Sequence, residues 1–111
     1  MEKRVEMNRL LDFYGALLTE NRREVMHAYL EEDLSLQEIA DNLSITRQGV
    51  HDAINKAQKQ LLDYENKLGL LSRYQRLQKA VVDCREALND KSPASIEKAK
   101  QILSSIIEIE R

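Results

Sequence analysis

Apolar residues recur every three to four positions along most of the chain, the spacing of one face of an α-helix, and no stretch alternates as a strand would. The pattern predicts a first helix over about residues 2–18, in which Gly15 is a weak point, and a second over about residues 20–31, capped by Thr19. The expected inward residues are Val5, Leu10, Leu11, Tyr14, Leu17 and Leu18 in the first helix and Val25, Met26, Tyr29 and Leu30 in the second. The predicted fold class is therefore all-α.

A helix-turn-helix is predicted between Ser35 and Val50. Ser35 can cap a helix, and Glu38, three residues later, can reach back to the Ser35 amide, which together make a capping box. Ile39 lies one turn before another apolar residue, Leu43, and both are expected to point inward. The small residue between them, Ala40, lets a second helix approach closely.

The second helix of this motif is predicted to begin after a turn through residues 43–45. The hydroxyl of Thr46 can accept a hydrogen bond from an amide of the first turn. The apolar positions that follow are spaced alternately by four and three and share one side of a single long helix; they are Val50, Ile54, Ala57, Leu61, Tyr64 and Leu68. This seam fails beyond Leu68, so Gly69 is the predicted end of the helix.

Two further helices are predicted to form a C-terminal helical hairpin, joined by a loop over residues 89–91, with Pro93 in the first turn of the last helix. Their seams are Leu70, Tyr74, Leu77, Val81, Cys84 and Leu88, then Ile96, Ala99, Ile102, Leu103, Ile106 and Ile107. This is more aliphatic surface than a helix-turn-helix core requires. Two explanations stay open: a homodimer or partner-docking face, and cover of the long helix within one chain. The predicted domains are residues 1–68, the helix-turn-helix with its long recognition helix, and residues 69–111, the hairpin.

Composition adds bounds to this prediction. The chain has 111 residues, 32% of them charged, with no tryptophan and one phenylalanine, which is typical of a soluble helical protein. No apolar run reaches the roughly 20 residues of a membrane span, and the charged N-terminus lacks a signal-peptide core, so a cytoplasmic location is expected. The single cysteine, Cys84, excludes a disulfide framework and is expected to be a small core residue.

The candidates for contact with nucleic acid lie mainly at the start of the long helix. A recognition helix places its first exposed residues against base edges, and here these are Arg47, Gln48, His51 and Asp52. Thr46, at the opening of the helix, is a further candidate for contact. Arg47 can contact a phosphate or a guanine edge, and Gln48 can read an adenine. Because the net charge is −2, binding must come from a local basic patch. The supporting candidates for that patch are Arg22, Arg23, Lys56 and Lys59.

Acidic residues oppose this assignment in part. Asp52 would lie near phosphates and repel them unless Lys56 or a cytosine amino group offsets its charge. Glu20 and Glu24 dilute the charge of Arg22 and Arg23, so a solvated, salt-bridged face is the alternative for that pair. A second basic set, Arg73, Arg76, Lys79 and Arg85, is best explained as solvated charge on the hairpin; contact with RNA or with an acidic protein surface is its alternative.

Several runs of the chain resemble known families. Residues 17–25 and 36–48 resemble region 4 of bacterial sigma factors. Over nearly the whole chain, Asp12-Phe13-Tyr14-Gly15, Leu34 to Ala40 and Ile45 to Val50 resemble the YlxM-like family of small bacterial helix-turn-helix proteins, whose genes lie beside those of the signal recognition particle. The resemblance implies a sigma-region-4-like fold, DNA binding, a regulatory role, and the protein or RNA of that particle as a partner.

Catalysis, a cofactor and a metal are not predicted. The sequence has no phosphate-binding glycine loop and no nucleophile motif, His27 and His51 do not make a metal site on their own, and His27 has no expected partner. Three functions stay open: a sequence-specific DNA-binding regulator, an accessory of the signal recognition particle in which the helix-turn-helix is only a scaffold, and an adaptor whose hairpin docks a partner helix.

Overall fold

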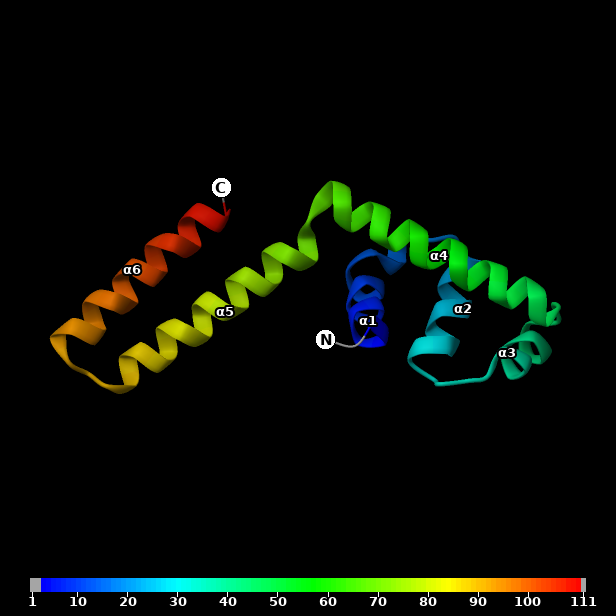
Figure 1. The fold of residues 1–111 in the computed structure, drawn as a ribbon, viewed down its shortest axis with the longest axis horizontal. Helices are drawn as coiled ribbons and strands as arrows, with labels where there is room; N and C mark the ends of the chain where they lie inside the picture. Colours follow the sequence, from blue (N-terminus) through cyan, green and yellow to red (C-terminus); the bar gives the residue numbers. More distant parts are fainter. Residues whose placement is uncertain (1–2, 111) are drawn as a thin grey trace. The chain divides into compact units, whose positions relative to one another are not determined.

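The computed structural model describes residues 3–110, and the regular structure in this range is helical (Figure 1). The elements are α1 (Lys3–Tyr14), the 3-10 turn η1 (Gly15–Leu17), α2 (Glu20–Leu30), α3 (Leu36–Leu43), α4 (Arg47–Leu68), α5 (Leu70–Asn89) and α6 (Pro93–Glu110). The chain divides into two compact units, Met1–Gly69, the N-terminal unit, and Leu70–Arg111, the hairpin unit. The predicted all-α, helix-turn-helix fold is confirmed.

The N-terminal unit is built on α4, which packs against α1, α2 and α3 (Figure 1). Its largest fully buried side chains come from all four helices: Leu10, Tyr14, Val25, Met26, Ile39, Val50 and Leu61. The buried ring of Tyr14 keeps its polar end satisfied, because its hydroxyl donates to Glu65 Oε1 at 2.6 Å. The core therefore fixes α4 against the helices that precede it in the chain.

Helix α1 is shorter than the sequence predicted. It ends before Gly15, and the chain continues as the tighter turn η1; Glu2, the predicted start, lies outside the described residues. The change of pitch takes the following residues off the α-helical register, and Leu17 is 53% exposed. Val5 is also exposed, while Met7 is buried. The prediction of one helix with Val5 and Leu17 inward was therefore wrong.

The caps of the helix-turn-helix are the predicted ones. The Glu38 amide donates to Ser35 Oγ at 3.1 Å, and the Ser35 amide donates to Glu38 Oε1 at 3.1 Å, which completes the capping box. The Gly49 amide donates to Thr46 Oγ1 at 2.9 Å, which begins α4. Between the two helices Ser44 has a φ of 58°, so a left-handed residue other than glycine reverses the chain.

Helix α4 carries a buried seam and ends where the sequence predicted. Its buried residues include Val50, Ile54, Ala57 and Leu61. Leu68 is 55% exposed, because the last turn of α4 continues past the part of the seam that the other helices of this unit cover; its prediction as an inward residue was wrong. Gly69 has a φ of 64°, and its amide donates to the Glu65 carbonyl at 2.8 Å, which closes the helix.

The hairpin unit consists of α5 and α6, which pack against each other through small residues. Cys84 and Ala99 are both buried, and the Cys84 thiol lies 3.8 Å from the Ala99 carbonyl oxygen. The loop between the helices passes through Lys91, whose φ is 58°. Cys84 is a free, buried thiol, as predicted for a small core residue.

Most of the predicted hairpin seam is not buried within the hairpin unit. The exposed members are Leu70, Tyr74, Val81 and Leu88 on α5 and Ile96, Leu103 and Ile107 on α6. Two helices in contact cover only the narrow strip of each that faces the other, and here that strip is built on Cys84 and Ala99. Among the described residues, no helix of either unit is long and apolar enough to cross a bilayer.

Candidate nucleic-acid interface

The opening of α4 is exposed at every predicted recognition position. Thr46, Arg47, Gln48 and His51 all face solvent. Thr46 uses its hydroxyl as the cap of α4, so its remaining capacity for a ligand is reduced. Arg47, the first residue of the helix, has no ion pair within residues 3–110. Its guanidinium is therefore available to a ligand.

Gln48 and His51 each lie beside a residue one turn further along α4. The Gln48 amide nitrogen donates to Asp52 Oδ1 at 3.0 Å, and Nδ2 of Asn55 lies 3.4 Å from Nδ1 of His51. The first contact occupies one oxygen of the Asp52 carboxylate but leaves its negative charge in place. A Gln48 side chain that turned toward a base would have to give up this hydrogen bond.

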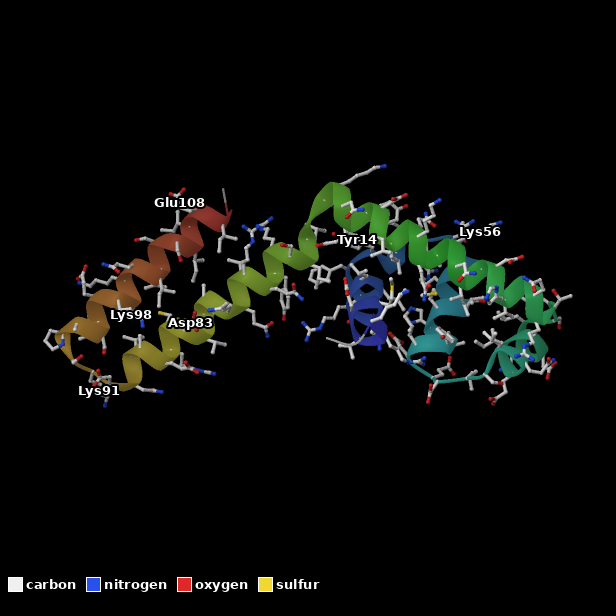
Figure 2. All side chains as sticks on the ribbon, viewed as in Figure 1. Tyr14, Lys56, Asp83, Lys91, Lys98 and Glu108 are labelled. Atoms are coloured by element: carbon white, nitrogen blue, oxygen red, sulfur yellow. The ribbon has the colours of Figure 1, made fainter. Side chains whose placement is uncertain are left out.

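A groove joins the start of α2 to the exposed side of α4. Its volume is about 330 Å³, and it is lined by Thr19, Asn21, Arg22, Gly49, Asp52, Ala53 and Lys56. Lys56 comes from the outer side of α4 (Figure 2), and Arg22 comes from the first turn of α2. The positive end of the α2 dipole lies at this same turn. The groove thus brings together two of the predicted phosphate-contacting side chains, with Asp52 as their acidic neighbour.

Arg22 is held along α4 by a chain of hydrogen bonds. It donates to Gln60 Oε1 at 2.9 Å, Gln60 donates to the Tyr64 hydroxyl at 2.9 Å, and Tyr64 donates to the Leu17 carbonyl at 3.4 Å. Gln60 is neutral, so this contact orients the guanidinium without cancelling its charge. The contact braces α2 against α4 and fixes where the charge of Arg22 lies.

The other two supporting candidates are not part of the groove lining. Lys59 is exposed on α4, and Arg23 is half-buried on α2. Within residues 3–110 neither is ion-paired with Glu20 or Glu24, the acids that the sequence offered as their alternative partners. Asn21 and Gln60 belong to the site but were not among the sequence candidates. The position of Asn21 in the first turn of α2, next to the cap Thr19, was the signal that could have identified it.

Comparison with known proteins places the chain in a family. A family model described as "Putative helix-turn-helix protein, YlxM / p13 like" matches residues 1–103. The chain belongs to this family, UPF0122. The match runs through the N-terminal unit and most of α6, so the hairpin is part of the family pattern and not an addition to it.

Relatives from several bacteria agree with the family assignment. A UPF0122 protein of Desulforamulus reducens is 41% identical over 107 residues, which cover 93% of this chain and 92% of the relative. One of Clostridium botulinum is 46% identical over 95 residues, 86% and 87% of the two chains. One of Bacillus mycoides is 39% identical over 106 residues and covers 96% of each. The predicted resemblance to YlxM-like proteins is confirmed.

The two histidines lie apart from any ligand cluster. His27 Nδ1 lies 2.7 Å from Glu31 Oε2, so the prediction that His27 lacks a partner was wrong; helical spacing of four residues accounts for the pair. Across the described part of the UPF0122 chain, no three His, Cys, Asp or Glu side chains converge as the ligands of a metal ion would.

The second basic set includes a side chain with an acidic partner on its own helix. Lys79 Nζ lies 2.9 Å from Asp83 Oδ2, four residues along α5. The hydrogen bond to Asp83 and its negative charge raise the pKa of Lys79, which therefore stays protonated. This pairing fits the sequence interpretation of Lys79 as solvated charge on the hairpin.

Proposed function

We propose that this UPF0122 protein binds DNA as a regulator, with the first turns of α4 in the major groove. In this arrangement Arg47, Gln48 and His51 meet base edges and Thr46 holds the start of the helix. Arg22 and Lys56 contact phosphates from the groove, and Arg23 and Lys59 add positive charge beside it. The observation that carries the proposal is the groove itself, which joins the basic start of α2 to the exposed side of the recognition helix.

The distribution of charged side chains supports contact with DNA through this surface. The chain as a whole has a net charge of −2, so its average electrostatic field repels DNA. Arg47 and Lys56 are exposed and have no acidic partner within residues 3–110, and Arg22 has a neutral one. Asp52 is the acidic residue within this group. Replacing it with asparagine removes a repulsive charge, so D52N is expected to bind DNA more tightly than the native chain.

The test is selection from fragmented DNA of the source organism, followed by sequencing of the retained fraction. Salt should be near-physiological, because phosphate contacts alone retain almost any basic surface at low salt. Enrichment of a short motif is the expected result. R47A should then lose about 1–3 kcal/mol of affinity for that motif. R76A, which removes the same charge from an exposed arginine of α5, is the matched control and should leave binding unchanged.

Two results would change the assignment. An equal loss on all sequences in R47A would mean that Arg47 contacts phosphate and reads no base. Retention of no DNA by the native chain would overturn the proposal.

The acidic character of the chain favours a second candidate, an accessory of the signal recognition particle. Its net charge is −2, and the exposed residues of α3 include Glu38 and Asp41, so this charge favours a basic protein surface over RNA phosphates, with the helix-turn-helix as a scaffold. The purified chain should then retain the particle's protein or RNA in a pull-down. D52N should not affect that retention, whereas it should affect DNA binding. If the chain retains neither component, this candidate is excluded.

A further inference from the structure

The hairpin unit has apolar side chains that its own two helices do not cover. Val81 and Leu88 on α5, and Ile96, Leu103 and Ile107 on α6, are between 42% and 59% exposed. Residues seven apart lie on the same side of a helix, and so do residues four apart. Val81 and Leu88 therefore share one side of α5, and the three residues of α6 share one side of that helix.

These two sides form one continuous face. A groove of about 320 Å³ runs between the helices on this side and is lined by Val81, Cys84, Arg85, Leu88, Asn89, Leu103 and Ile106. We call the five exposed residues and this groove the apolar face. The other side of the hairpin differs in character, since Asp83 and Lys98 from the two helices line its groove (Figure 2). The hairpin thus has one charged side and one apolar side.

The apolar face is comparable in area to the largest apolar patch of a typical monomer, and such patches are often interaction sites. Half-exposed side chains of this size offer on the order of 100 Å² each, so the five give roughly 500 Å², near the upper end for the largest patch on a monomer. A standard interface covers about 800 Å² on each partner, so the face with its polar rim supplies most of the area that a stable pair requires.

We propose that a second copy of this chain covers the apolar face, so that two hairpin units form a four-helix bundle. The helices of the hairpin have similar lengths, 20 and 18 residues, and each presents a stripe at the spacing that bundle packing uses. In a dimer with a two-fold axis, the apolar face of one copy packs against the apolar face of the other. Both faces are then buried, so no further copies can add to the dimer through this face.

Pairing of the hairpins gives a dimer whose contacts do not involve α1 to α4. Each dimer contains two copies of the surface proposed to bind DNA. That consequence alone rests on the proposed function: the bound DNA would contain two half-sites. The pairing itself requires only the hairpin unit.

The test measures the mass of the full chain in solution, without nucleic acid, by multi-angle light scattering and sedimentation at about 10 and 100 μM, the range of moderate affinities. The native chain is expected to have twice the 12.9 kDa mass of one copy. L103E places a charge in the apolar face and should give single copies. L17E is the matched control, because Leu17 is 53% exposed and Leu103 is 51% exposed, but Leu17 lies in the N-terminal unit; this variant should stay paired.

Circular dichroism of each variant shows whether the helices remain folded, and I107E, at the most exposed position of the face, repeats the test if L103E loses helicity. A native chain with the mass of one copy at both concentrations would overturn the proposal, whether the face stays open or receives another protein. L103E and I107E that remain folded and paired would also overturn it. Because no DNA is present, these outcomes do not depend on whether the N-terminal unit binds DNA.

Discussion

The large apolar side chains that meet around the α4 seam of the N-terminal unit are buried, whereas those beside the contact between Cys84 and Ala99 of the hairpin unit are exposed. Leu10, Tyr14 and Leu61 have no exposed surface, whereas Leu103 and Ile107 keep half or more of theirs. Both units are helical, and both have apolar residues at spacings of three and four. The difference lies in how many helices cover each seam. Three helices pack on α4, but α5 and α6 pack only on each other within their unit.

A helical seam specifies a side of a helix and not the degree of burial of its residues. In the N-terminal unit the seam of α4 meets side chains from helices on several sides, so large residues are enclosed. In the hairpin unit the contact strip is built on Cys84 and Ala99, whose small side chains let the two backbones approach. The large residues then lie beside that strip and remain open to solvent or to a partner.

Deletion of a core side chain in the N-terminal unit should have the largest effect. L61A removes three carbon atoms from a side chain with no exposed surface and should lower the free energy of unfolding by about 2–5 kcal/mol. Urea denaturation followed by circular dichroism measures this. L62A is the control, because Leu62 is the next residue and is 39% exposed; it should lower the free energy of unfolding far less. Equal costs at Leu61 and Leu62 would contradict the assigned core.

Loss of a helix cap should have an intermediate effect in both units. Thr46 accepts from the Gly49 amide, and Ser92 accepts from the Ser95 amide, so T46A and S92A should each lower the free energy of unfolding by roughly 1 kcal/mol. Only T46A should also weaken the proposed DNA binding, because Thr46 begins the recognition helix. A binding assay on both variants separates these effects, and a loss of DNA binding in S92A would implicate the hairpin in recognition.

Replacement of an exposed leucine of the hairpin unit by alanine should change the free energy of unfolding only slightly, provided that dilution keeps the chains as single copies. L103A removes the same atoms as L61A from a side chain that is 51% exposed, and the expected change in the free energy of unfolding is within about 0.5 kcal/mol. The measurement is urea denaturation at sub-micromolar protein. If L103A lowers the free energy of unfolding as much as L61A does, Leu103 is buried within a single chain. The two units would then not differ in the burial of their leucine side chains.

The smallest effect should come from acidification of the hairpin loop. Hydrogen bonds from the Ser95 and Ser92 hydroxyls lower the pKa of Asp90 below its ordinary value of 3.8. A carboxylate with a lowered pKa stabilises the fold above its ordinary pKa, and this contribution is lost as the pH falls through the lowered value. Unfolding midpoints of the native chain and D90N should therefore differ slightly at about pH 6 and converge at low pH. A difference that grows on acidification would contradict the assignment.

Local signals in the sequence predicted the helices and their ends with good accuracy. The capping box at Ser35, the cap at Thr46 and the stop at Gly69 depend on residues within a few positions of one another, so the sequence contains all that is needed to place them. The prediction was wrong where α1 changes pitch at Gly15, because several helical geometries are compatible with one glycine and packing selects among them.

The candidate site could be predicted only in part for the same reason. Exposure of Gln48 follows from the seam, since two residues of separation place it on the other side of the helix from Val50. Arg47 and His51 are exposed as well, in the first turns of α4. The contacts of Arg22 and His27 and the groove beside α2 depend on which long side chain reaches which partner. Such partners are chosen by tertiary packing and are not encoded in residue spacing.

By itself the sequence of this UPF0122 protein determined the helical class and the helix-turn-helix, because these depend on local hydrogen bonds and on the period of the α-helix. It also determined the family, through the residues that the chain shares with its relatives. The tertiary structure decided which apolar seams became core. Burial is a property of the number of neighbours around a side chain, and that number is set by the whole fold. The same spacing of leucine and isoleucine therefore gives a closed core around α4 and an open face on α5 and α6.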